Sequence, residues 1–131
     1  AMVKDGSPIA KLADLDGKRV SVQVGTKSVG FLTEHYPKVQ RVEVEKNQEM
    51  FNLVAIGRTD AAVTGKPAAF QYLRTRGGMK VLGEQLTTEE YGMAVRKDMP
   101  ELTQAVNKAL AQLKADGGYQ AIVDKWFPSS K

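Results

Sequence analysis

The sequence predicts a single α/β lobe with a mostly parallel sheet and helices on both of its faces. Two observations favour this fold class. Short β-branched segments with strand periodicity alternate along the chain with amphipathic helical segments, and most of these segments end at a glycine or a proline. The 131 residues are enough to bury a core, and the apolar and charged fractions of 42% and 26% are ordinary for a globular protein.

The strand pattern at residues 19–24 is the clearest in the chain, and we expect it to be central. Valines at positions 20, 22 and 24 alternate with Ser21 and Gln23, and Gly25 ends the pattern. Ser28 stands where the N-cap of a following helix is expected. Such a strand–glycine–helix turn presents free backbone N–H groups at the carboxyl end of the strand, where α/β sheets bind ligands. A plain turn with nothing bound is the alternative.

The other elements follow from the same patterns. In chain order we expect a strand ending at residues 3–4, one helical turn at 12–15, a helix at 28–36, a strand at 39–44, a helix from 46 or 47 to 57, a strand at 60–64, a helix at 66–76 and a strand at 80–82. Gly57 is the expected C-terminal stop of its helix, and Pro67 lies in a first turn, where proline costs little.

The C-terminal third is predicted to be helical after an extended segment at 91–98. Apolar residues recur at helical spacing from Leu102 to Leu113, within a helix expected at 100–116. A last helix carries Tyr119, Ile122, Val123, Trp126 and Phe127 on one face and ends at Pro128. We expect these helices either to fold back on the sheet or to pack against a second copy of the chain, because large apolar faces are seldom left in water.

The composition narrows the possible chemistry. There is no cysteine, which removes disulfides, thiolate catalysis and cysteine zinc sites. His35, the single histidine, is expected to have a surface or packing role, and no residue spacing suggests a metal site or a cofactor. The net charge of +4 is spread along the chain, so no nucleic-acid surface is expected. No apolar run approaches the ~20 residues of a membrane span. The abrupt start, without a signal peptide, suggests a piece of a longer chain.

Several short motifs together resemble a known family. They are Gly-Lys-Arg-Val at 17–20, Gln-Val-Gly-Thr at 23–26, Gly-Arg-Thr-Asp-Ala-Ala-Val-Thr at 57–64, Gly-Glu-Gln-Leu at 83–86, Tyr-Gly-Met-Ala-Val-Arg-Lys at 91–97 and Ala-Asp-Gly-Gly-Tyr…Lys-Trp-Phe at 115–127. In this order they resemble the extracytoplasmic solute-binding proteins of polar amino-acid ABC transporters, family 3, which have the type II periplasmic binding fold. That family has two α/β lobes that close on a ligand in the cleft between them.

The resemblance implies that residues 1–131 hold one lobe of such a protein. Residues 7–86 resemble the second lobe, and 1–6 and 91–97 resemble the two hinge strands. Residues 98–131 resemble the C-terminal helices that return to the first lobe, and the N-terminal part of that lobe is absent from this sequence.

The resemblance also implies a ligand-binding edge. Thr26 and Lys27 occupy the turn that meets a ligand carboxylate, after Gln23 and Gly25. Thr64 and Gly65 occupy a second turn, in which the family usually has aspartate at the position of Gly65. That aspartate pairs with the ligand's ammonium group, so an ordinary α-amino-acid ligand is expected only if Glu84 or a first-lobe acid substitutes.

Three functions remain open from the sequence. The first is binding of a small polar solute, amino-acid-like or a small carboxylate, for ABC import, or for a receptor that senses it. This implies an ABC permease as partner, a periplasmic or otherwise extracytoplasmic location, and a possible homodimer through the C-terminal helices.

The second is a dehydratase-like cleft enzyme, which would need paired acids from among Glu84, Glu89 and Glu90. The third, an effector domain of a transcription regulator, would need a DNA-binding segment that this sequence lacks. We favour the first, with no enzymatic activity.

Overall fold

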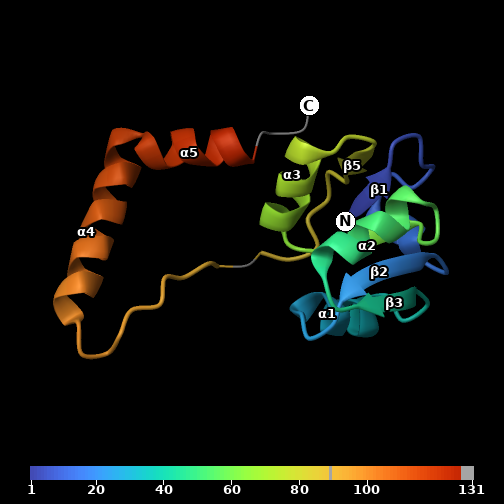
Figure 1. Cartoon of the computed structure of the whole chain (residues 1–131), viewed down its shortest axis with the longest axis horizontal. Helices are drawn as coiled ribbons and strands as arrows, with labels where there is room; N and C mark the ends of the chain where they lie inside the picture. The colour runs from blue at the N-terminus through green and yellow to red at the C-terminus, as the bar shows by residue number, and fades with distance from the viewer. Residues whose placement is uncertain (89, 128–131) are drawn as a thin grey trace. The chain divides into compact units, whose positions relative to one another are not determined.

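The computed structural model describes residues 1–88 and 90–127, which divide into two compact units (Figure 1). The first unit, Ala1–Leu86, contains β1 (Met2–Lys4), the 3₁₀ turn η1 (Leu12–Leu15), β2 (Arg19–Gln23), α1 (Lys27–His35), β3 (Gln40–Val44), α2 (Asn47–Ala55), β4 (Ala61–Val63), α3 (Lys66–Thr75) and β5 (Met79–Val81). The second unit begins at Thr87 and contains α4 (Pro100–Asp116) and α5 (Gly118–Trp126). The α/β class and the order of elements are as the sequence predicts.

The first unit is built on a five-stranded sheet with the order β3-β2-β4-β1-β5. β2 pairs in parallel with β3 on one side and with β4 on the other. β1 runs antiparallel to both of its neighbours, β4 and β5. The strand predicted at residues 19–24 as the central one is paired on both sides, as β2, but β4 occupies the middle of the sheet.

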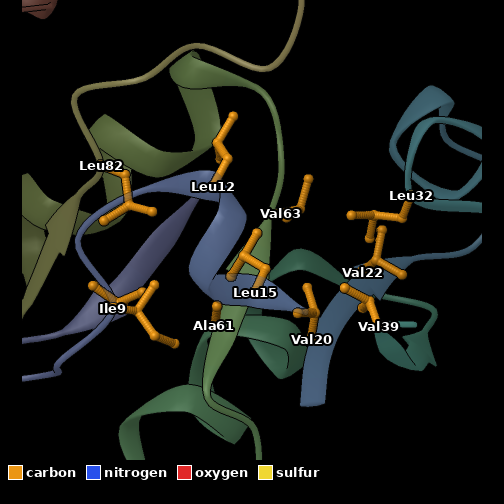
Figure 2. Packing of buried hydrophobic residues seen from close by; sticks show 11 residues of the cluster. Ile9, Leu12, Leu15, Val20, Val22, Leu32, Val39, Ala61, Val63 and Leu82 are labelled. Atoms are coloured by element: carbon orange, nitrogen blue, oxygen red, sulfur yellow. The ribbon is translucent and has the colours of Figure 1, made fainter. Parts of the chain in front are cut away.

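One face of the sheet packs against η1 and α1. Val20 and Val22 of β2 point to this face and are completely buried, as is Leu32 of α1 (Figure 2). The other buried members of this cluster are Val3, Ile9, Leu12, Leu15, Val39, Ala61, Val63 and Leu82. Every second side chain of β2 points to this face, because successive side chains of a strand point to opposite faces of the sheet.

The opposite face packs against α2 and α3. Its buried members are Met2, Val44, Met50, Phe51, Val54, Ala62, Ala69, Tyr72 and Met79. The rings of Phe51 and Tyr72 join the two helices, with centroids 4.6 Å apart. Ser21 also points to this face, where its Oγ donates a hydrogen bond to the carbonyl of Met50 at 2.9 Å. Helices therefore cover both faces, as the sequence predicts.

The helix boundaries differ from the predictions in small ways that have local causes. α1 begins at Lys27 with Thr26 as its N-cap, so the prediction of Ser28 as N-cap is wrong. The N-cap therefore lies two residues before Ser28, in a turn where the hydroxyl of Thr26 donates to the carbonyl of Gln23 at 2.7 Å. Gly57 follows the C-cap of α2 with φ +78°, which confirms it as the stop of that helix.

The second unit consists of a segment without regular secondary structure at 90–98, followed by α4 and α5. Gly117 has φ +81° and separates the two helices, which contact one another. No residue of either helix is buried, and the side chains of Leu102, Tyr119, Ile122 and Trp126 are 42–51% exposed. The apolar stripe that the sequence predicts is therefore present and accessible. Whether the sheet or a second copy of the chain covers this stripe stays a prediction. Pro128, the expected end of the last helix, lies outside the described residues.

No helix within the described residues is long and apolar enough to cross a membrane.

Candidate ligand-binding site

The turns after β2 and β4 lie side by side at one edge of the sheet. Val22 pairs with Val63 in the parallel β2–β4 ladder, so the next residues, Gln23 and Thr64, follow at the same level. α1 begins at Lys27 and α3 begins at Lys66, each a few residues past the end of its strand. Two helix N-termini therefore share this carboxyl edge, and the N–H groups of a first helical turn have no partners within their own helix.

Hydrogen bonds fix the turn after β2. The N–H of Val24 donates to the carbonyl of Val44 in β3 at 2.9 Å. Gly25 has φ +72°, a conformation that glycine adopts without strain. The Nε2 of Gln23 donates to the carbonyl of Glu45 at 2.9 Å, so this side chain links the turn to the segment after β3. These hydrogen bonds and the conformation of Gly25 define the geometry of the turn.

The turn after β4 is the simpler of the two. Gly65 is the N-cap of α3 with φ −70° and ψ 150°, an extended conformation that any residue adopts. Its carbonyl accepts the N–H of Ala69 at 3.2 Å, and Pro67 lies in the first helical turn. The backbone conformation at this position does not require glycine. An aspartate could therefore stand here without backbone strain.

Glu84 already has a partner within the lobe. Its Oε2 accepts a hydrogen bond from the N–H of Leu12, the first residue of η1, at 2.6 Å. This contact satisfies one of the free N–H groups at the start of that turn. A ligand ammonium group at Glu84 would therefore compete with the backbone of η1. Glu90 is exposed, and Glu89 lies outside the described residues.

β1 enters the sheet at the same edge because it runs antiparallel to β4. The carbonyl of Ala1 accepts the N–H of Leu82 at 2.9 Å.

His35 takes no part in the edge. It is exposed at the end of α1 and its ring stacks on Phe31, with centroids 4.4 Å apart, in agreement with the predicted surface role. Within the described residues, no three side chains of the types that ligate metals come together.

Arg19 and Asp60 form an ion pair at the opposite edge of the sheet, which the sequence patterns did not predict. Arg19 Nη2 lies 3.3 Å from Asp60 Oδ1, and the Arg19 N–H donates to Asp60 Oδ2 at 2.9 Å. The hydrogen bond from the Arg19 side chain holds the pKa of the Asp60 carboxyl below its ordinary value. The signal for it was present, since Arg19 opens β2 and Asp60 directly precedes β4, which runs beside it.

Comparison with known proteins adds evidence independent of this geometry. Residues 3–129 match the family of bacterial extracellular solute-binding proteins, family 3. The ABC transporter arginine-binding protein 1 of Escherichia coli (strain K12) is 36% identical over 121 residues, which cover 88% of this chain and 50% of that protein.

Two solved structures are similar along nearly the whole chain. An ancestral cationic amino acid solute-binding protein superimposes with a TM-score of 0.79 at 39% identity, over 96% of this chain and 56% of that one. The GluR0 ligand-binding core from Nostoc punctiforme, in complex with L-glutamate, gives a TM-score of 0.72 at 32% identity, over 98% of this chain and 59% of that one. The similarity confirms the type II periplasmic binding fold.

The chain spans about half the length of the curated relatives it matches. These relatives are named for the solutes that they bind, not for reactions that they catalyse. Since the family match extends over almost all of the sequence, the chain belongs to the bacterial extracellular solute-binding proteins of family 3.

Proposed function

We propose that this chain forms one wall of a cleft that captures a small polar solute, amino-acid-like or a small carboxylate, for import by an ABC transporter. The observation that carries the proposal is the parallel β2–β4 register, which brings two strand–helix turns together at the carboxyl edge of the sheet. The N–H groups and dipoles of α1 and α3 favour a carboxylate there. Family membership supports solute binding as the use of this edge.

A single wall should bind its ligand weakly. Pockets that bind small molecules tightly bury most of the ligand surface, whereas one lobe leaves much of it in water. Calorimetry of the chain against amino acids and small carboxylates should give no dissociation constant tighter than about 1 mM, or about −4 kcal/mol. Micromolar binding by this chain would show that the second wall is unnecessary.

Gly65 should decide whether an α-amino acid binds well. Without a carboxylate there, a ligand ammonium group would be buried unpaired at the turn after β4. In a longer protein with the first lobe restored, Gly65→Asp should create or strengthen amino-acid binding. Gly77→Asp, which adds the same charge beyond the other end of α3, is the matched control. Tight amino-acid binding before either substitution would refute this role of Gly65.

Sensing by a receptor is the second candidate function, because the GluR0 ligand-binding core has the same fold. A full-length sequence distinguishes the two, since a receptor continues into a membrane-spanning segment. A cleft enzyme is less well supported: it needs paired free acids, and Glu84 is bonded to the Leu12 N–H. Incubation with the solutes that bind should leave them chemically unchanged.

We further propose an extracytoplasmic location and, for the full-length protein, an ABC permease as partner. For this chain alone, the exposed stripe on α4 and α5 supports a homodimer. Light scattering should then give twice the chain mass, and Ile122→Ser, at a side chain that is 51% exposed, should return the monomer. A monomeric parent chain would refute the dimer.

A further inference from the structure

β3 is an edge strand whose outer side has no partner strand. It is the terminal strand in the order β3-β2-β4-β1-β5, and among the described residues it pairs only with β2 (Figure 1). β3 has five residues, whereas β5 at the other end of the sheet has three. An exposed edge presents unpaired N–H and carbonyl groups on which another strand can pair. β3 therefore offers the longer of the two edges of this sheet.

The backbone of β3 places Arg41 and Glu43 on this outer side. The N–H of Gln40 donates to the carbonyl of Lys18 at 2.8 Å, and the carbonyl of Val44 accepts the N–H of the residue after β2 at 2.9 Å. Because successive residues of a strand point their backbone groups to opposite sides, every second residue of β3 faces β2. The N–H and carbonyl groups of Arg41 and Glu43 therefore face away from the sheet.

The side chains on this edge carry opposite charges two residues apart. Arg41 Nε lies 3.5 Å from Glu43 Oε1, and the two side chains are 30% and 41% exposed. Lysine and proline, which protect many edge strands from pairing, are absent from β3. Opposite charges across a strand pair stabilise a sheet, and like charges destabilise it. The best partner strand would therefore present an acid to Arg41 and a base to Glu43.

A second copy of β3 meets this requirement. In an antiparallel pair centred on Val42, Arg41 of each copy lies directly opposite Glu43 of the other. Both residues face outward, so each opposite pair can exchange its two backbone hydrogen bonds in this register. The two copies are then related by a two-fold axis, and the same surface is used on both, as in most symmetric dimers.

We propose that β3 is a self-pairing edge, through which two copies of the chain join their sheets. The pairing uses none of the residues of the candidate ligand-binding site, so it does not depend on the proposed function. It is also separate from the stripe on α4 and α5, because β3 belongs to the first unit. One strand edge buries much less than the ~1,200–2,000 Å² of a stable interface, so this pairing should need protein at about 1 mM.

The test is amide NMR of the full 131-residue chain carrying Ile122→Ser, which removes the pairing proposed for α4 and α5. Spectra are compared between about 0.05 mM and about 2 mM protein, on either side of the expected dissociation constant. The amides of Arg41 and Glu43 should shift with protein concentration and exchange more slowly with solvent when the protein is concentrated. The amides of β5 should not change.

Charge reversals locate the contact. Arg41→Glu or Glu43→Arg alone places like charges across the pair and should weaken it at least about fivefold. The double variant, or an equal mixture of the two single variants, places opposite charges across the pair again and should restore it. Lys80→Glu, at an exposed residue of β5, changes the net charge as Arg41→Glu does and is the matched control, which should pair like the parent.

Circular dichroism should show that every variant is folded. Amides of Arg41 and Glu43 that do not respond to protein concentration would overturn the second copy as the partner of this edge. Single reversals that pair as well as the parent, or a double variant that does not recover, would overturn it as well. Each of these results would leave the proposed solute binding intact.

Discussion

Replacing Gly25 with alanine should destabilise the first unit through the backbone alone. Gly25 has φ +72°, and an added Cβ would meet no atom within 4 Å. The cost is therefore conformational: a left-handed residue other than glycine costs about 1–2 kcal/mol. Alanine also restricts the unfolded chain, which returns about 0.4–1 kcal/mol. The expected net loss of unfolding free energy is about 1 kcal/mol.

Gly30 provides the matched control in the same segment. It lies within α1, its φ is not positive, and an added Cβ there also meets nothing within 4 Å. Gly30→Ala should stabilise the unit by about 0.8–1 kcal/mol, because glycine is a poor helix former. The two substitutions add the same methyl group five positions apart in the chain, yet their effects should differ by about 2 kcal/mol.

Urea denaturation followed by circular dichroism measures both effects, provided that the slope m is unchanged. Equal effects of the two substitutions would refute the left-handed turn that forms the candidate site.

Two further predictions concern stability. Ser21→Ala removes the bond to the Met50 carbonyl and the 3.2 Å contact with the buried Thr59 hydroxyl, and should cost about 1–3 kcal/mol in thermal or urea unfolding; no loss would contradict the buried network. Asp60→Asn removes an exposed pair with Arg19 and should cost about 0.2–1 kcal/mol near neutral pH. Because the folded pKa of Asp60 is lowered, its contribution is present above the ordinary carboxyl pKa and is lost as pH falls through the lowered value. Urea unfolding should therefore show the difference between Asp60→Asn and the parent vanishing in acid, and a constant difference would contradict the pairing.

Local sequence patterns were sufficient to predict the helices and strands and the two turns of the candidate site. The alternation of Val20 and Val22 with Ser21 predicts the strand and the face that the two valines bury, as the structure has them. The burial of Ser21 on the opposite face does not follow from this pattern. The strand–glycine–helix sequence at Gly25 and Gly65 predicts two turns, and parallel pairing brings them to one edge.

Interactions between distant parts of the chain could not be predicted. Periodicity marks Met2–Lys4 as a strand but does not show that it lies between β4 and β5 and runs against both. Glu84 bonds to Leu12, 72 residues away, which no local pattern indicates. The N-cap of α1 lies at Thr26, two residues before the predicted Ser28, and the Thr26 hydroxyl bonds back to Gln23.

The most direct test of the account is the map of amides that shift when the chain is titrated with L-glutamate. If the two turns form one binding edge, the largest changes should appear together at residues 25–27 and 64–66, with a common dissociation constant. Residues 4–6, at the other edge of the sheet, should stay unchanged. Shifts in only one turn, or larger shifts at residues 4–6, would contradict the claim that β2 and β4 build a single ligand-binding edge.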